Sequence, residues 1–322
     1  MIHTKILGTG SYVPEHIVSN FDLEKLVDTN DEWIQSRTGI VNRRVTQGEN
    51  TSELAYKAAV KALEDANTKA EDIDLIIVAT VTADYPFPAV AQILQRRLNC
   101  KVITAFDINA ACTGFIYALN VADKMIRSGA YHKALVIGAE TLTKYTDYED
   151  RNTCVLFADA AGAMVIGESE TSHIEKVITY SKGDLEGLLK MEGYPLKENF
   201  KTPEQKRPFI TMQGTEVFKF ATSVLPQVVK TLIQETHHEM NDVSLIIAHQ
   251  ANRRIIDKSA RVLKIPMEKM FMNIDQYGNT SAASVPLAID EAIRKNVLKR
   301  GDLFITAAFG AGLTWGGAMI KY

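Results

Sequence analysis

The strongest constraint on the fold of this chain is an internal repeat of four apolar segments, which occur in the same order in its two halves. The pairs are residues 72–78 with 242–248, 103–107 with 271–275, 133–138 with 302–307, and 162–165 with 317–320. Three pairs keep nearly the same spacing, whereas the last has shifted, as an inserted loop would cause. One matching pair of apolar strands means little, but four in one order indicate a duplicated unit.

Each repeated unit alternates short apolar runs with longer segments of helical spacing. Residues 73–80 are typical of a buried strand, and residues 51–63 carry apolar side chains at the spacing of a helix. We therefore expect an α/β fold of two halves, residues 1–170 and 171–322, which face each other about a pseudo-dyad and share one site at their strand ends. Residues 183–208 are rich in Lys, Glu, Gly and Pro, and they predict an exposed excursion.

The composition limits the function classes. Of the 322 residues, 46% are apolar and 23% are charged, which is typical of a soluble globular protein with a sizeable core. The net charge of −3 gives no basic field that would indicate nucleic acid as a partner. The three cysteines follow no disulfide framework, which favours a reducing compartment. The start has no signal-peptide core and no apolar run has the length of a membrane span, so we expect a cytoplasmic enzyme without a membrane partner.

One cysteine lies where a predicted strand turns into a predicted helix. Residues 102–106 are short, apolar and partly β-branched, and residues 115–126 have the apolar coverage of a buried helix that ends near Gly129. Cys112 lies between them, at the positive end of the helix dipole, which favours thiolate over thiol. A thiolate is the nucleophile that attacks a thioester. Because a single cysteine is more often a small buried apolar residue, its partners decide its role.

The repeat supplies two candidate partners. His249 directly follows the apolar run 245–248, and Asn279 lies in the segment that aligns with the Cys112 turn. We therefore expect both side chains near Cys112, although each alone is consistent with a core histidine or a turn residue. His237 and His238 are consecutive, and no spacing typical of a metal site occurs, so no metal is expected.

A glycine-rich run near the C-terminus adds backbone amide groups. Residues 308–317 have the sequence Ala-Phe-Gly-Ala-Gly-Leu-Thr-Trp-Gly-Gly. Glycine-rich turns let backbone N–H groups approach a ligand closely, which suits an oxyanion hole, although such a turn is weak evidence by itself.

Taken together, the motifs resemble those of β-ketoacyl-acyl carrier protein synthase III, a condensing enzyme of the thiolase-like superfamily. The motifs are Ala111-Cys112-Thr113-Gly114, His249-Gln250-Ala251-Asn252, Tyr277-Gly278-Asn279-Thr280-Ser281-Ala282-Ala283-Ser284 and Phe309-Gly310-Ala311-Gly312, with Asp28-Thr29-Asn30-Asp31-Glu32-Trp33-Ile34 and Arg37-Thr38-Gly39-Ile40 near the start. The resemblance covers nearly the whole chain. It implies a five-layered αβαβα sandwich of two duplicated halves, in agreement with the repeat.

The resemblance implies a reaction in two steps that initiates type II fatty acid synthesis. An acyl-CoA would acylate Cys112, and decarboxylative Claisen condensation with malonyl-acyl carrier protein would then give a β-ketoacyl-acyl carrier protein. His249 and Asn279 would donate hydrogen bonds to the malonyl thioester carbonyl, and the amides of Cys112 and Ala311 would form the oxyanion hole. No cofactor is implied beyond coenzyme A as part of the substrate, and the chain would form a homodimer.

The same resemblance gives binding roles to further residues. Trp33, Arg37 and Arg151 would bind coenzyme A, and Phe87 would limit the acyl pocket across a dimer interface. The carrier protein would contact a predicted basic helix and the residues before it, namely Gln250, Ala251, Asn252, Arg253, Arg254, Lys258 and Arg261. For all of these residues, local packing or a solvated surface is the alternative interpretation.

Two departures from the family pattern and several rival functions stay open. Ala311 stands where the family usually has glycine, and Ala158 and Ala160 stand where it often does. A polyketide or quinolone-type condensing enzyme would use the same cysteine, histidine and asparagine. A cysteine hydrolase uses a similar set, but the papain-type local signature is absent. A non-catalytic scaffold is disfavoured because the polar set is complete, and the sequence does not determine the starter acyl group.

Overall fold

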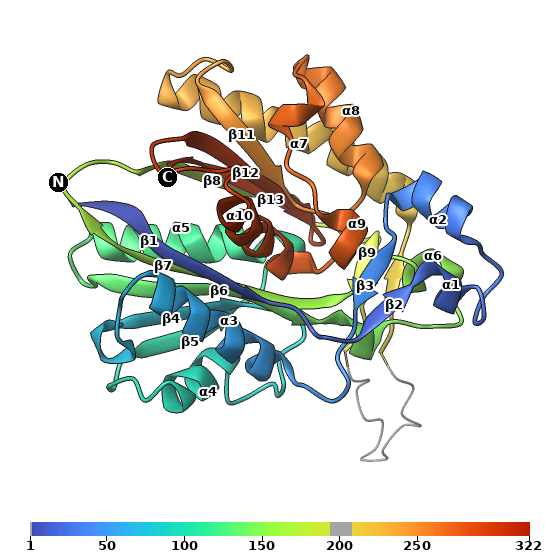
Figure 1. Cartoon of the computed structure of the whole chain (residues 1–322), viewed down its shortest axis with the longest axis horizontal. Helices are drawn as coiled ribbons and strands as arrows, with labels where there is room; N and C mark the ends of the chain where they lie inside the picture. Colours follow the sequence, from blue (N-terminus) through green and yellow to red (C-terminus); the bar gives the residue numbers. More distant parts are fainter. Residues whose placement is uncertain (1, 194–207) are drawn as a thin grey trace.

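The structure is a computed structural model that describes residues 2–193 and 208–322. Two β-sheets alternate with three layers of helices, which gives a five-layered αβαβα sandwich (Figure 1). The architecture expected from the repeat is therefore confirmed.

The first sheet consists of strands from the N-terminal half. In spatial order they are β1 (His3–Tyr12), β7 (Asp159–Ser169), β6 (Lys133–Thr141), β4 (Leu75–Ala79) and β5 (Thr104–Ile108). Strand β4 is parallel to both β5 and β6, whereas β7 is antiparallel to β6 and β1. Helices α3 (Thr51–Asp65) and α4 (Val90–Arg97) cover the outer face through a buried cluster that includes Leu54, Ile76 and Leu94.

The second sheet repeats this arrangement with strands from the C-terminal half. In spatial order they are β11 (Val243–Ala248), β12 (Leu303–Gly310), β13 (Thr314–Lys321) and β8 (Ile174–Ser181). Strands β11 and β12 are parallel, and β13 is antiparallel to β12 and β8. Helices α7 (Gly214–Thr236) and α8 (Arg253–Leu263) cover the outer face through a cluster that includes Leu225, Ile246 and Ile256.

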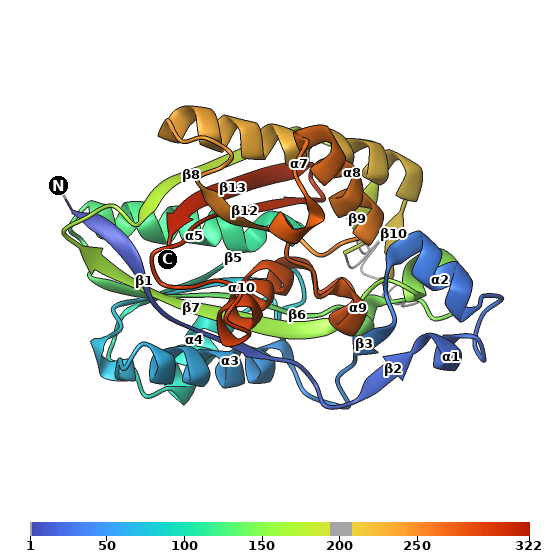
Figure 2. The ribbon, with the colours of Figure 1, turned by 45° about the horizontal axis from the view of Figure 1, so that its top comes forward.

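The middle layer joins the two halves. Helices α5 (Gly114–Arg127) and α10 (Ser284–Arg294) lie between the sheets in both views of the ribbon (Figures 1 and 2). Phe115, Leu119 and Ile289 are fully buried there, in one cluster with side chains of both sheets. Because each such side chain contributes about 1.5–3 kcal/mol on burial, this layer is a large part of what holds the halves together.

Strand registers show how closely the halves match. Leu75 of β4 lies opposite Ala134 of β6, and at the corresponding positions of the second half Leu245 of β11 lies opposite Phe304 of β12. The corresponding strand pairs of the two sheets therefore keep the same relative register.

The repeat predicts a strand at residues 271–275, and this prediction is wrong. Met270 forms only an isolated bridge with Ile246, and residues Ile274–Tyr277 form the short helix α9. The side chain of Gln250 accepts a hydrogen bond from the backbone N–H of Asn273 at 3.1 Å, so this backbone group is paired without a neighbouring strand. The two halves differ here before they converge again at the next turn.

The turn that follows α9 and the turn at Cys112 in the other half have the same backbone conformation. Short 3₁₀ turns, Ala111–Thr113 and Ser281–Ala283, each begin with a residue of positive φ, 47° at Ala111 and 49° at Ser281. Each turn packs on a glycine of the opposite sheet. A Cβ on Gly138 would lie 2.2 Å from the Ala282 carbonyl oxygen, and one on Gly310 would lie 2.8 Å from the Cys112 nitrogen. The two turns thus meet at the centre of the molecule.

Smaller elements surround this centre at one end. They are β2 (Ile17–Ser19), α1 (Asn20–Leu23), α2 (Asp31–Thr38), β3 (Asn42–Arg44), α6 (Arg151–Cys154), β9 (Leu189–Met191) and β10 (Ile210–Met212). Helix α2 contacts α8, and β9 pairs with β10 beside them (Figure 2). Of the predicted excursion 183–208, residues 194–207 lie outside the described residues. No helix in the described part of the chain is long and apolar enough to cross a bilayer.

Candidate active site

Cys112 lies in the turn between β5 and α5, as expected. Only 7% of the residue is exposed, and the side chain of Asn109 accepts a hydrogen bond at 3.3 Å from the backbone N–H of Ala111. The positive φ of Ala111 directs the chain sharply from the strand into the helix. All three cysteines of the chain are free.

The surroundings of the Cys112 sulfur disfavour the predicted thiolate. Burial raises the pKa of the Cys112 thiol to about 12, and the nearby Glu140 carboxyl adds to the rise, whereas a hydrogen bond with the Ser281 hydroxyl opposes it. Burial therefore opposes the thiolate that the sequence predicts at the start of α5. In the protonated form, the proton must leave the sulfur when it attacks a substrate.

His249 follows the last residue of β11 and is 1% exposed. Its backbone N–H donates to the carbonyl of Ala307 at 2.8 Å, and its ring lies 5.3 Å from the ring of Phe309 in an edge-on arrangement. Nδ1 lies 2.6 Å from the hydroxyl of Ser284. Burial lowers the pKa of His249 to about 3, so the imidazole is neutral at physiological pH.

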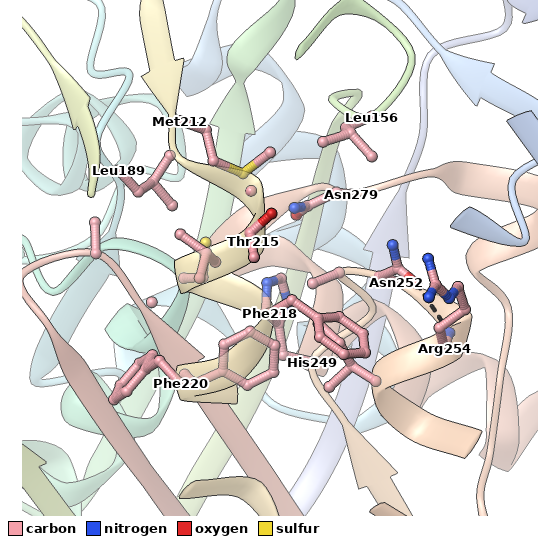
Figure 3. A pocket seen from close by; sticks show the side chains of 18 of the residues that line it. Leu156, Leu189, Met212, Thr215, Phe218, Phe220, His249, Asn252, Arg254 and Asn279 are labelled. Atoms are coloured by element: carbon pink, nitrogen blue, oxygen red, sulfur yellow. Dashed lines mark hydrogen bonds between the residues drawn. The ribbon is translucent and has the colours of Figure 1, made fainter. Parts of the chain in front are cut away.

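Asn279 follows Gly278, whose φ of 65° places it in the left-handed region. The Asn279 backbone N–H donates to the Leu156 carbonyl at 2.9 Å, and its side-chain oxygen accepts from the Ser281 N–H at 2.9 Å. These bonds hold the side chain in place and occupy its oxygen. Its Nδ2 donor is therefore the group available to a ligand, and Figure 3 shows the amide beside the pocket that His249 also lines.

Cys112, His249 and Asn279 line one cavity of about 400 Å³ (Figure 3). Its remaining wall includes apolar side chains from four separate segments, among them Leu156, Leu189, Met212, Phe218 and Phe309. Arg37 and Arg254 also line it, and both are exposed, so the cavity extends from the buried cysteine to the surface. The structure thus brings together the three side chains on which the sequence prediction depends.

A second cavity of about 210 Å³ also borders Cys112. The two cavities share Cys112, Phe157, Leu189 and Ala311, so the sulfur lies where they adjoin. The second cavity is lined mainly by apolar side chains, namely Val81, Leu142, Phe157, Leu189, Met191 and Ile210, together with Asn109, Ala111, Lys190, Ser281 and Ala311.

The glycine-rich turn is tied to the Cys112 turn by the Thr314 hydroxyl. It lies 3.1 Å from the Ala110 carbonyl and 3.0 Å from the Ala311 carbonyl. Positive φ falls on Gly312, at 123°, and not on Ala311. The alanine methyl is therefore compatible with the backbone conformation, and Ala311 remains beside Cys112 in both cavities.

Comparison with known proteins decides the family. Residues 106–183 match the family described as 3-oxoacyl-[acyl-carrier-protein (ACP)] synthase III, and residues 233–322 match the C-terminal part of that synthase. The β-ketoacyl-[acyl-carrier-protein] synthase III of Clostridium acetobutylicum is 48% identical over 323 residues, which cover 100% of this chain and 99% of that protein. The chain belongs to the β-ketoacyl-[acyl-carrier-protein] synthase III family.

Solved structures of related proteins agree over the whole length. The synthase III of Aquifex aeolicus has a TM-score of 0.93 at 48% identity, covering 99% of this chain and 100% of that one. The priming β-ketosynthase of the R1128 polyketide pathway also has a TM-score of 0.93, at 33% identity, covering 99% of this chain and 96% of that one. The five-layered fold of the synthase III family is thus present from end to end.

Of the three residues predicted to bind coenzyme A, Arg37 lines the first cavity, whereas Trp33 and Arg151 contact each other outside its lining. The Arg151 guanidinium lies 5.0 Å from the centre of the Trp33 ring and donates to the Asp28 carbonyl at 2.8 Å. Arg37 lines the cavity, and its backbone carbonyl accepts from the Asn252 side chain at 2.9 Å. In this synthase III family member, Trp33 therefore stacks with Arg151, and Arg37 lies at the cavity wall.

The predicted carrier-protein residues do not form one surface. Gln250 is 1% exposed, and its side-chain amide donates to the carbonyls of Ala248 and Phe271, so the prediction that it contacts a carrier protein is wrong. Asn252 caps the start of α8, and Ala251 is half-buried beside it. Arg253, Arg254, Lys258 and Arg261 are exposed on α8.

Phe87 lines neither cavity of its own chain and is 85% exposed.

The structure also adds two site residues that were not predicted from the sequence. Ser284 contacts His249, and the charge of Glu140 raises the pKa of Cys112. Ser284 stands in the motif that contains Asn279, but only the folded chain shows which side chain it meets. The cavity wall contributed by β9 comes from the predicted excursion 183–208, and the wall contributed by β10 follows directly after it.

Proposed function

We propose that this synthase III family member transfers an acyl group from an acyl-CoA to Cys112 and condenses it with malonyl-acyl carrier protein. Membership of the family makes the chain an acyltransferase, a condensing enzyme of type II fatty acid synthesis. The observation that carries the proposed mechanism is the single cavity lined by Cys112, His249 and Asn279.

In the first half-reaction, the Cys112 sulfur attacks the thioester carbonyl of the acyl-CoA. The bond from the carbonyl carbon to the coenzyme A sulfur breaks, and the thiol proton ends on that sulfur. The backbone N–H groups of Cys112 and Ala311 are proposed to stabilise the oxyanion of the tetrahedral intermediate. Ala311 borders both cavities next to the nucleophile, which supports this role.

In the second half-reaction, the malonyl thioester loses carbon dioxide and becomes an enolate. His249 and Asn279 are proposed to donate hydrogen bonds to its thioester oxygen, where negative charge develops. The enolate carbon then attacks the acyl carbon on Cys112, the bond to sulfur breaks, and the sulfur takes up a proton. The free Nδ2 donor of Asn279 and the neutral imidazole of His249 support these roles.

Substrate groups are assigned to the two cavities as part of the same proposal. The second cavity, of about 210 Å³, is proposed to hold the acyl chain, with Phe87 of a second copy of the chain completing it. A homodimer is therefore part of the proposal. Arg37, Trp33 and Arg151 are proposed to bind coenzyme A at the exposed end of the first cavity, and Arg151 would move from the Trp33 face to admit the adenine ring.

The basic residues of α8 are proposed to dock the acidic carrier protein. Arg254 and Lys258 lie 5.3 Å and 5.5 Å from the ring of Phe218, which itself lines the first cavity. Arg254→Glu should raise the KM for malonyl-acyl carrier protein about tenfold, and more than it raises the KM for the acyl-CoA. Lys299→Glu, at an exposed site on another part of the chain, is the control. An unchanged KM in Arg254→Glu contradicts docking at α8.

The proposed function is tested by supplying the two substrates separately. With an acyl-CoA alone we expect one equivalent of coenzyme A to be released and an acyl group to remain on Cys112. A cysteine hydrolase would instead produce free acid continuously. Adding malonyl-acyl carrier protein should then release carbon dioxide and a β-ketoacyl product, and a panel of straight and branched starters identifies the acyl group. Because Cys112 must be a free thiol, we expect the enzyme to work in the cytoplasm.

A further inference from the structure

The side chain that contacts the imidazole of His249 is Ser284, the first residue of α10. Its Oγ lies 2.6 Å from His249 Nδ1 and 3.4 Å from the backbone nitrogen of Gln250. Ser284, His249 and Gln250 are each 1% exposed, so water does not replace these bonds. Nδ1 is occupied by this contact, and Nε2 is the ring nitrogen left for a ligand in the cavity.

The hydrogen-bond inventory around Ser284 shows which group donates. A serine hydroxyl has one proton to donate and two lone pairs. The Gln250 N–H donates to Oγ and uses one lone pair. Within residues 2–193 and 208–322, Nδ1 is the one hydrogen-bond acceptor that Oγ meets. If Nδ1 carried a proton, the hydroxyl proton would be buried without an acceptor, which is unfavourable.

We propose that Ser284 is a positioning residue, which donates its proton to Nδ1 and holds His249 as the tautomer with hydrogen on Nε2. The inference rests on the proposed function, because Nε2–H is the donor that the malonyl thioester oxygen requires. In this tautomer Nε2 has no lone pair to accept the Cys112 proton. His249 is therefore a hydrogen-bond donor in the condensation and not the base that activates Cys112.

The N-terminal half lacks this pair at the matching place. There the residues are Ala79, at the end of β4, and Gly114, the first residue of α5. A Cβ on Gly114 would lie 3.0 Å from the Cβ of Ala79, so the two positions are neighbours in that half as well. The duplicated backbone brings the two positions together, and only the second half has polar side chains there.

Nitrogen-15 NMR of the histidine-labelled full chain reads the tautomer directly. The His249 signals are identified by their loss in His249→Ala. At pH 7 we expect an unprotonated Nδ1 and a protonated Nε2 in the wild-type chain. A protonated Nδ1 in the wild-type chain would overturn the proposal, whatever the variants do.

Kinetics of Ser284 variants provide the second readout. In Ser284→Ala, kcat for decarboxylation of malonyl-acyl carrier protein should fall about tenfold or more, since the imidazole is no longer held in one tautomer. KM and the rate of acylation by acyl-CoA should stay within about twofold. Ser284→Thr keeps the hydroxyl and should recover most of kcat. An unchanged kcat in Ser284→Ala contradicts the proposal.

A matched control removes a buried serine hydroxyl elsewhere. Ser259 is fully buried on α8, where its hydroxyl donates to the Ile255 carbonyl at 2.8 Å. Ser259→Ala should leave kcat for decarboxylation within about twofold of wild type, and an equal loss in both alanine variants contradicts a specific role of Ser284.

The two readouts also separate failure of this inference from failure of the proposed function. If the proposed function is wrong, the wild-type chain will not release carbon dioxide from malonyl-acyl carrier protein, and the NMR spectrum still reports the tautomer. If only the role of Ser284 is wrong, the wild-type chain condenses normally while Nδ1 carries the proton.

Discussion

The turn at Cys112 and the turn at Ala282 have the same backbone conformation but carry different side chains. Both begin with a residue of positive φ, Ala111 at 47° and Ser281 at 49°. Before each lies an asparagine whose side-chain oxygen accepts from that residue's N–H, at 3.3 Å for Asn109 and 2.9 Å for Asn279. The same strain and the same local bond thus occur twice.

The side chains around the two turns diverge. Asn109 is exposed, whereas Asn279 is 7% exposed and lines the first cavity with Cys112. Glu140 lies near the end of β6, and Gly310 ends β12 at the corresponding place. The N-terminal half thus contributes the proposed nucleophile and a buried carboxyl, and the C-terminal half contributes the proposed hydrogen-bond donors. The matching backbone places both sets at the same kind of turn, and the side chains alone distinguish them.

Loss of the nucleophile should have the largest effect. Cys112→Ala is expected to reduce acyl transfer by about 10⁴-fold or more, because no other group on its turn can carry the acyl chain. The variant should still decarboxylate malonyl-acyl carrier protein, since the donors of the other turn are intact. Acyl-enzyme mass and carbon dioxide release measure the two activities separately, and acylation at the wild-type rate would exclude Cys112 as the nucleophile.

The two asparagines provide a direct comparison of the turns. Asn279→Ala or His249→Ala should lower decarboxylation on the order of 10²–10³-fold, because each removes one donor to the developing enolate, and should leave acylation in place. Asn109→Ala removes the matching local bond in the other half and should change decarboxylation less than about tenfold. If Asn279→Ala condenses normally, the assignment of the donors is wrong.

Glu140 is expected to make stability depend on pH, while Gly310 at the matching place cannot. Burial raises the pKa of the Glu140 carboxyl to about 7, against hydrogen bonds from Thr82, Val81 and Thr80 that favour its charged form. A folded-state pKa above the unfolded value gives a stabilisation that is present at acid pH and is lost as pH rises through about 7.

Glu140→Gln should remove this pH dependence. Between pH 5 and pH 8 the free energy of unfolding of the wild type should fall relative to the variant by about 1–3 kcal/mol. Urea unfolding of both proteins at the two pH values measures the difference. Parallel behaviour of the two proteins would show that Glu140 does not titrate in this range.

The smallest expected effect is the pH response of the donors. Because burial lowers the pKa of His249 to about 3, its imidazole stays neutral as pH falls from 8 to 5 and would gain a proton only in stronger acid. The kcat for malonyl-acyl carrier protein decarboxylation in Cys112→Ala should therefore vary less than about twofold over that range. A loss of activity centred near pH 6.5 would indicate an exposed, titrating histidine instead.

Much of the site was predictable because it lies on the repeat. His249 follows an apolar strand, Cys112 precedes a buried helix, and Asn279 stands in the corresponding turn, so a periodic pattern was enough to associate them. Gln250 shows where the pattern stops: it belongs to the same motif as His249, but its amide is buried and bonded to Ala248 and Phe271.

The sequence by itself determined the duplicated α/β architecture and the identity of the three central side chains, because strand and helix periodicity is a local property of the chain. Only the tertiary structure showed that burial raises the pKa of Cys112 and lowers that of His249, and that Ser284 is the side chain in contact with His249. The pKa shifts depend on burial in a low-dielectric interior, and the contact with Ser284 joins residues far apart in the chain. No short segment of the sequence encodes either of these.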